Sequence, residues 1–389
     1  MKVIGVIVFV LAVQAIVAQS SIQIPLVIEA QYAIGTVAPV YPQFPKKTFS
    51  QAFELHVGYQ TTGTRVWHRL FNYPRMGLSF IFQDLGNERV LGHQFSVVPT
   101  VYFSTAHREK SKVYAEIRYG LGVAYFSNPY DSLRNPDNKG ASSRFTWQFT
   151  LGANLRWNID KRTSLQIGGV WYHASNSHTQ LPNVGVNNFA LYAGILTYPF
   201  GQMPRRHHLD TMKLDHRWHF NIQVGVGMHK RGSAFGPVHG TLYPVYTLSL
   251  YTNKRLGKLF QFKFGAIYRY YPMYQSFFAD YHIAGGASPL RSSSFIFFVG
   301  NEFMLGRIAL NIEVGVNIYK PAYETFYNTF EKASKFTYYT KQYIATRFGF
   351  NYYLLDPDKH PRNNAFVGAG VSANFGQAEF LEFNLGYRF

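Results

Sequence analysis

The sequence predicts an all-β protein, a transmembrane antiparallel β-barrel of about 14–16 strands, from three observations. Aromatic residues make up 18% of the 389 residues and charged residues only 15%, whereas a soluble globular domain carries roughly 25% charged residues. Apolar and polar residues alternate along many segments, as on strands with one apolar and one polar face. Beyond the first 18 residues no stretch of about 18 uncharged apolar residues occurs, which excludes helical membrane spans.

Residues 1–18 are predicted to form a secretory signal peptide. Lys2 is followed by the apolar run Val3–Val13, and the small residue Ala18 precedes the expected cleavage point. A membrane anchor is the alternative, but the run is short for a span and Gln14 interrupts it. The chain is therefore expected to be exported. Because it contains no cysteine, disulfides, thiol catalysis and Cys-ligated zinc are excluded.

The strands are predicted from the period-two alternation. In the segment 307–319, for example, apolar side chains at every second position alternate with Ala, Asn, Glu and Gly. Segments of about 10–14 residues suit tilted transmembrane strands better than the shorter strands of a soluble sandwich. The chain also ends on an aromatic residue, Phe389, which resembles bacterial outer-membrane barrels. The sixteen predicted strands span 27–37, 51–62, 74–84, 94–104, 112–126, 143–158, 162–175, 186–199, 217–229, 240–253, 258–271, 294–305, 307–319, 341–355, 364–375 and 377–389.

The connections predict how the chain is organised in the membrane. An even strand count places both chain ends on the periplasmic side, so the long loops at 127–142, 272–293 and 320–340 are predicted to be extracellular. Two connections fit this pattern poorly, since 200–216 is long for a periplasmic turn and 376–377 is short for an outer loop. Fourteen strands are therefore an alternative.

A faint internal repeat supports the even strand count. The sequences 53–58, 87–92 and 165–170 resemble 220–225, 253–257 and 310–315, respectively. Residues 19–200 are interpreted as one β-strand half and residues 201–389 as a second half that completes the barrel. A pair of linked eight-stranded barrels, from a duplicated unit, is the alternative to one wide barrel.

One cluster of residues carries recognisable chemistry. His173 and Ser175 lie two residues apart on a predicted strand, so their side chains leave the same, lipid-facing side near the extracellular rim. A neutral imidazole can take the serine proton and make Ser175 a nucleophile toward an ester carbonyl. Asn187, on the lipid-facing side of the next strand, could accept the other ring N–H and hold the tautomer. Alternatively, these residues are ordinary polar side chains of the headgroup zone.

The motif His173-x-Ser175-Asn176, followed by Pro182-Asn183-x-Gly185-x-Asn187, resembles that of the outer-membrane lipid A 3-O-deacylases, the PagL-type acyloxyacyl hydrolases. The resemblance implies that His173 is the base, that Ser175 is the nucleophile, and that Asn176 and Asn183 are candidate oxyanion donors. The chain departs from the well-known deacylases at Asn187, where they have a glutamate. The sequence also resembles outer-membrane phospholipase A in its His-x-Ser-Asn motif and downstream asparagine. This second resemblance implies that Asn187 is the third catalytic residue, which orients the imidazole without carrying charge.

The resemblance implies a serine esterase of the bacterial outer membrane that removes an acyl chain from lipid A at the outer leaflet. A phospholipase A-like esterase and a non-catalytic porin or structural barrel are the alternatives. Lipid A or lipopolysaccharide and outer-membrane lipid are the predicted partners, whereas the oligomeric state stays open. No nucleic acid is expected, because the net charge of +18 in an exported barrel is better matched by anionic lipid phosphates.

No cofactor or metal is predicted. The histidine-rich segment 205–208, with His216 and His219, shows no recurring metal-ligand spacing and is interpreted as a solvated basic connection. The sequence also contains no phosphate-binding loop, dinucleotide fingerprint or zinc signature.

Overall fold

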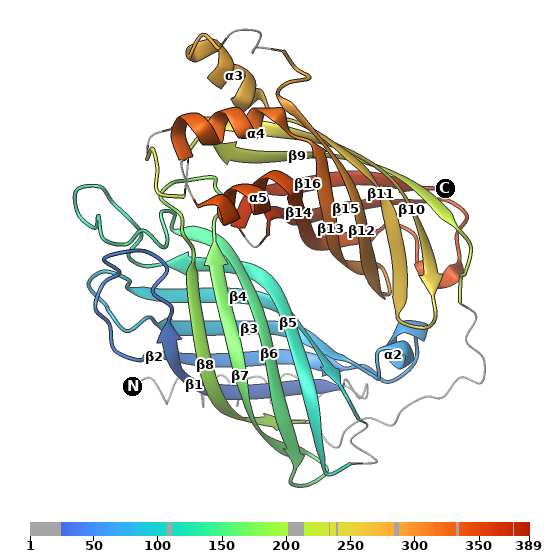
Figure 1. Ribbon diagram of the computed structural model, residues 1–389. Helices are drawn as coiled ribbons and strands as arrows, with labels where there is room; N and C mark the ends of the chain where they lie inside the picture. Colours follow the sequence, from blue (N-terminus) through green and yellow to red (C-terminus); the bar gives the residue numbers. More distant parts are fainter. Residues whose placement is uncertain are drawn as a thin grey trace.

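The structure, a computed structural model, forms two closed eight-stranded antiparallel barrels (Figure 1). It describes residues 25–106, 111–200, 214–232, 234–238, 240–283, 288–331, 334–375 and 377–389. The predicted signal peptide, residues 1–18, lies outside the described residues. The all-β barrel prediction is confirmed, and of the two architectures left open by the sequence, the structure has the pair of barrels.

The first barrel contains β1 to β8 and the second β9 to β16. The strands of the first are β1 Leu26–Val37, β2 Ser50–Gln60, β3 Arg75–Asp84, β4 His93–Ser104, β5 Val113–Phe126, β6 Phe145–Asn158, β7 Thr163–Ser175 and β8 Val186–Thr197. Those of the second are β9 His219–Lys230, β10 Leu242–Leu256, β11 Phe260–Tyr270, β12 Ser293–Leu305, β13 Ile308–Tyr319, β14 Ile344–Tyr353, β15 Asn364–Asn374 and β16 Gln377–Arg388.

Each barrel closes by pairing its first strand with its last. Tyr32 of β1 is paired with Ala193 of β8, and Val224 of β9 is paired with Leu385 of β16. Strands β9 to β16 therefore close a barrel of their own and do not complete a wider one. The connection that seemed too long for a turn, 200–216, belongs to the linker between the two barrels.

The internal repeat does not follow this duplication. Residues 53–58 lie on β2, the second strand of its barrel, whereas 220–225 lie on β9, the first strand of its barrel. Likewise, 165–170 lie on a seventh strand and 310–315 on a fifth. Alternating β sequences match one another by chance, because their period is the same in every strand.

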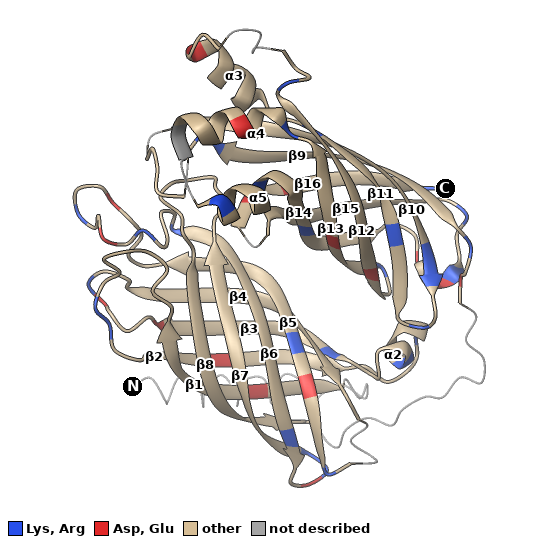
Figure 2. Ribbon diagram, viewed as in Figure 1, with Lys and Arg blue, Asp and Glu red and all other residues tan. Residues whose placement is uncertain are grey.

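Polar side chains fill the interior of each barrel. In the first, Arg156 Nη2 lies 2.9 Å from Glu29 Oε2 and 2.6 Å from Glu116 Oε2. In the second, the Arg347 guanidinium lies 2.7 Å from Glu313 and 3.3 Å from Glu382. Figure 2 shows how sparse charges are along the strands. Since an eight-stranded barrel is just wide enough for its own side chains, each interior is a packed polar core.

Short helices lie in the connections, where the sequence predicted only loops. They are α2 Val66–Leu70, α3 Pro272–Asp280, α4 Pro321–Phe326, the π-helix η1 Tyr327–Glu331, α5 Lys335–Tyr343 and the 3-10 helix η2 Pro357–Lys359. Among the described residues, none of the helices is both long and apolar enough to cross a membrane. α3, α4 and α5 cover the end of the second barrel at which the long loops predicted to be extracellular lie, hereafter the extracellular end. α2 lies at the opposite end of the first barrel, hereafter the periplasmic end (Figure 1).

The two barrels contact each other at both ends. On the periplasmic side, Trp67 and Phe71 of the α2 region pack with Leu305 of the second barrel. Gly306 has φ +70°, and a Cβ there would lie 2.9 Å from Trp67 Nε1, so glycine permits both the turn and the close approach. On the extracellular side, Asn183 N donates to Ala234 O over 2.7 Å. Because like ends meet, the barrels share one orientation in the membrane.

Candidate active site

The candidate site lies on the outward face of β7 and β8, at their extracellular ends. His173 is directly opposite Asn187 in the register between these strands, and Ser175 follows on the same face of β7. The neighbouring residue Tyr172 points inward, where its hydroxyl donates to Glu54 Oε2 over 3.0 Å. The alternation of β7 thus turns His173 and Ser175 away from the barrel interior, the orientation that their parity in the sequence predicts.

Asn187 orients the imidazole of His173. Its Oδ1 lies 2.9 Å from His173 Nδ1 and accepts the indole N–H of Trp171 over 3.0 Å. Because an amide oxygen only accepts, His173 Nδ1 carries the proton in this arrangement, and Nε2 of the neutral ring is left with a lone pair. The neutral imidazole can therefore accept a proton at Nε2. Trp171, which fixes the amide orientation, was missed in the sequence, although it shares the parity of His173.

Two donors from the loop after β7 surround the hydroxyl of Ser175. Asn183 Nδ2 donates to Ser175 Oγ over 2.9 Å and the backbone N–H of Ser177 donates over 3.2 Å. Among the hydrogen bonds of the described residues, none joins Ser175 to His173; catalytic hydrogen bonds are often long before substrate binds. No sequence pattern marks the N–H of Ser177 as a donor, because its direction depends on the loop conformation, with φ 53° at this residue.

Asn176 and Asn183 have different surroundings, although the sequence placed both as candidate oxyanion donors. The Nδ2 of Asn176 donates to Ser142 Oγ over 3.1 Å and to Gln180 O over 2.9 Å. Its amide therefore ties the β7–β8 loop to the connection before β6. Only Asn183 directs its side-chain N–H groups at Ser175.

Aromatic rings lie on the membrane-facing surface next to the site. The Trp171 ring stacks on Phe189 at 6.1 Å and meets the Phe149 ring edge-on at 5.3 Å. Gly185 approaches from the loop with φ +84°, and a Cβ there would lie 3.1 Å from His173 Cε1, so a larger residue would crowd the imidazole. The arrangement offers an apolar surface for an acyl chain beside polar groups suited to ester chemistry.

The other histidine candidates are separate from this site. Residues 205–208 lie outside the described residues, and His219 Nε2 lies 3.1 Å from Asp215 Oδ2 at the periplasmic end of the second barrel. Although burial opposes it, hydrogen bonds from Arg217 hold the pKa of Asp215 well below its usual range. Within the described residues, no three His, Asp or Glu side chains group as metal ligands would.

Comparison with known proteins assigns a family model to each barrel. The model described as lipid A 3-O-deacylase (PagL) matches residues 51–196, and the model described as acyloxyacyl hydrolase, C-terminal domain, matches residues 216–389. No curated protein sequence matches the chain.

Several solved structures are similar to parts or most of the chain. The outer membrane enzyme PagL is 19% identical over 43% of this chain and 97% of its own, with a TM-score of 0.30. Neisserial surface protein A is 12% identical over 45% of this chain and 97% of its own, also with a TM-score of 0.30. OpdK from Pseudomonas aeruginosa is 9% identical over 94% of this chain and 97% of its own, with a TM-score of 0.22.

Proposed function

Because the chain belongs to the lipid A 3-O-deacylase (PagL) and acyloxyacyl hydrolase family, we propose that it is a serine esterase that removes an ester-linked acyl chain from lipid A. The reaction takes place at the outer leaflet. The observation that carries this proposal is the pairing of His173 with Asn187 beside Ser175, on the lipid-facing surface at the extracellular rim. Residues 19–200 form the catalytic half.

The chain lies in the bacterial outer membrane. Closed barrels satisfy all of their backbone hydrogen bonds between strands, which a lipid environment requires. The outward faces of both barrels carry exposed apolar side chains, such as Ile167 and Leu191 in the first and Val316 and Leu385 in the second. The site at the extracellular end of β7 is thus within reach of lipid headgroups and of the ester bonds beneath them.

The first half of the reaction acylates the enzyme. His173 Nε2 accepts the proton of Ser175, whose Oγ attacks the ester carbonyl carbon. The negative charge that develops on the carbonyl oxygen is stabilised by the N–H groups of Asn183 and Ser177, which surround Oγ in the free enzyme. His173 then gives its proton to the sugar oxygen, the ester bond breaks, and the deacylated sugar leaves.

The second half releases the fatty acid. A water molecule loses a proton to His173 and attacks the acyl-serine carbonyl, and His173 returns the proton to Ser175 as the bond breaks. Throughout, Asn187 holds the imidazole through Nδ1. An acidic third residue would both orient the ring and stabilise the imidazolium by its charge. Asn187, a neutral amide, has only the first of these roles.

The test is mass spectrometry of lipid A and phospholipids from cells that express the wild type or Ser175→Ala. We expect one acyl chain to be lost from lipid A only with the wild type. Ser132→Ala, in an exposed stretch of the extracellular loop between β5 and β6, is the matched control and should behave as the wild type. Identical lipid profiles in all strains would contradict an enzymatic function. Release of lysophospholipid instead would identify a phospholipase.

A further inference from the structure

A cavity of about 60 Å³, lined by both polar and aromatic side chains, opens at the extracellular end of the second barrel. It lies between the ends of β9, β13, β15 and β16 and the helices α3, α4 and α5, and it is also lined by His178 of the first barrel. A cavity of about 10–15 Å³ holds one water molecule. The cavity therefore has room for several water molecules or for a small anion with four oxygens.

The charges that line the cavity favour an anion. Lys230, Lys320 and Lys341 line the cavity together with one carboxylate, Glu379, so these four residues contribute a formal charge of 3 − 1 = +2. Lys320 Nζ lies 3.9 Å from Glu379 Oε1, and the same carboxylate lies 3.4 Å from Arg269. Since Glu379 is shared between two cations, the cavity keeps an excess of positive charge.

The polar groups of the cavity are buried and held in place. Lys320 is 4% exposed, and its ammonium donates to Lys341 O over 2.9 Å and to Asn374 Oδ1 over 3.2 Å. His229 is 5% exposed, and among the residues that the structure describes its Nε2 has no hydrogen-bond partner. A buried polar atom without a partner is costly, and an anion in the cavity could satisfy it.

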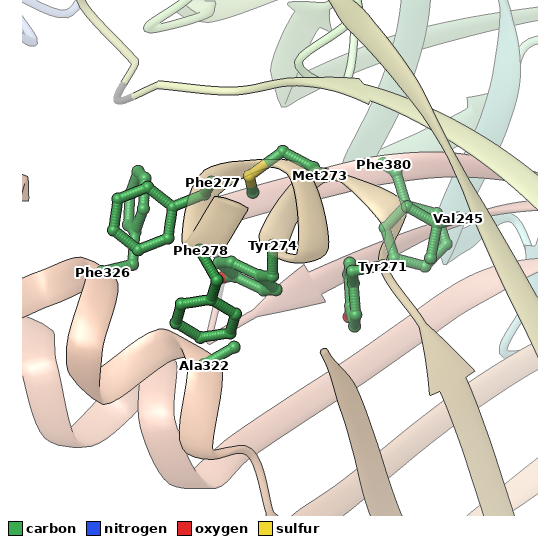
Figure 3. Close-up of a cluster of buried hydrophobic side chains, with 9 residues drawn as sticks. All are labelled: Val245, Tyr271, Met273, Tyr274, Phe277, Phe278, Ala322, Phe326 and Phe380. Carbon is green, nitrogen blue, oxygen red and sulfur yellow. The ribbon is translucent and has the colours of Figure 1, made fainter. Parts of the chain in front are cut away.

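An apolar cluster walls the cavity on one side. Figure 3 shows α3 and α4 packed together through Phe277, Phe278 and Phe326. Phe326 of this cluster, with Met273 and Tyr274, also lines the cavity. Aromatic packing of this kind fixes the helices and keeps water from one side of the cavity, where attraction between unlike charges is stronger than in bulk water.

The cavity and the candidate active site share one loop. Lys230 N donates to His178 O over 3.0 Å, and His178 is the third residue after Ser175. In the same loop, Asn183 donates through Nδ2 to Ser175 Oγ and through its backbone N–H to Ala234 O of the second barrel. A group bound in the cavity would therefore lie beside the loop that surrounds the nucleophile.

We infer that this cavity binds a phosphate group on the headgroup of the same lipid whose acyl ester reaches Ser175. The inference rests on the proposed function and gives the second barrel a part in it. Lipid A carries its acyl chains on phosphorylated sugars, so a phosphate site next to the β7–β8 loop would position the ester. Lysine ammonium groups are suited to phosphate as compact point charges.

The test is a binding measurement on the full chain in detergent, in the Ser175→Ala background so that no lipid is consumed. Phosphorylated lipid A and enzymatically dephosphorylated lipid A are the two probes. We expect Lys341→Gln to weaken binding of the phosphorylated lipid about ten-fold, the effect of losing one charge-assisted hydrogen bond. Binding of the dephosphorylated lipid should not change. Lys335→Gln, an exposed lysine on the same helix α5 that does not line the cavity, is the matched control.

If Lys341→Gln weakens binding of both lipids equally, or weakens binding of neither, the assignment of the cavity to a lipid phosphate is overturned. Inorganic phosphate alone distinguishes the source of the anion. If it binds and is lost in Lys341→Gln while both lipids bind equally well, the cavity is a site for free anions and the lipid assignment is overturned. Because binding is measured without turnover, phosphate-dependent binding in a wild type that does not hydrolyse lipid A would contradict only the proposed function.

Discussion

The two barrels have the same strand count and the same kind of interior, yet they differ at their extracellular ends. In the first, ten residues, 176–185, connect the seventh and eighth strands and surround Ser175. In the second, only residues 375–376 connect the equivalent strands β15 and β16. The second barrel instead carries α3, α4 and α5 over its end (Figure 1). The barrel is a scaffold common to both halves, and functional residues in proteins lie disproportionately on the connections between such elements.

This difference suggests a division of work between the barrels. The first holds the groups suited to ester chemistry, and the second holds a cationic cavity and the backbone oxygen of Ala234 that anchors Asn183. Changes in the first barrel should therefore reduce the chemical step. Changes at the junction should have smaller effects, on binding and stability.

The largest effect is expected at His173. His173→Gln removes the proton acceptor, and kcat for lipid A hydrolysis should fall by about 10³-fold or more. The measurement is the rate of fatty-acid release from lipid A in detergent micelles. His216→Gln, at the exposed periplasmic end of the second barrel, should leave the rate unchanged. A His173→Gln enzyme of wild-type activity would disprove the assignment of catalysis to the first barrel.

The next effect is expected at Asn183. Asn183→Asp keeps the oxygen that accepts the Asn176 N–H but removes the donor to Ser175, so kcat should fall by about 10²–10³-fold, as for other oxyanion donors. Asn176→Ala should cost less, because its amide contacts the loop and not Ser175. The same fatty-acid assay compares them. A larger loss in Asn176→Ala would reverse their roles.

A smaller effect is expected at Asn187. Asn187→Leu removes the acceptor for His173 Nδ1, and kcat should fall by about 10²-fold, less than the roughly 10⁴-fold known for an acidic third residue, because no charge is lost. Asn187→Asp keeps an oxygen acceptor and should retain activity. The pair is compared by kcat at saturating lipid A. Equal activity of Asn187→Leu and the wild type would show that the imidazole is oriented by other contacts.

The smallest effect is expected where the barrels touch within the membrane. The Phe348 ring of β14 meets Phe149 at 5.6 Å and Tyr119 at 5.4 Å. Phe348→Ala should lower the free energy of unfolding by about 1 kcal/mol, the value of one or two aromatic contacts, and change kcat little. Thermal unfolding in detergent measures it. The control is Phe297→Ala, because Phe297 lies on the outward face of β12 and is 60% exposed. An equal loss of stability in both variants would indicate no specific contact between the barrels.

Much of the fold could be predicted because alternation is a local signal. All sixteen predicted strands are present, and the largest boundary differences, at β10 and β14, are three residues. The helices were not predicted, since α3 and α4 are stabilised by packing against each other and against the end of the barrel. Short helices owe most of their stability to such tertiary contacts and little to their own sequence.

The candidate site was only partly predictable. The side of the barrel to which His173, Ser175 and Asn187 belong follows from parity, because side chains on a strand alternate with a period of two. The different environments of Asn176 and Asn183 do not follow from it, since they depend on hydrogen bonds within the β7–β8 loop and to Ala234.

The sequence by itself thus determined the strands, their outward faces and the residues that share the membrane-facing surface of β7 and β8, since each of these depends on neighbours a few positions away. Tertiary structure alone decided that β1 pairs with β8 and β9 with β16. It also decided that residues from β9, β15, β16, the helices α3, α4 and α5, and the β7–β8 loop line one cavity. These contacts join residues far apart in the chain, and period-two alternation fits one wide barrel as well as it fits two small ones.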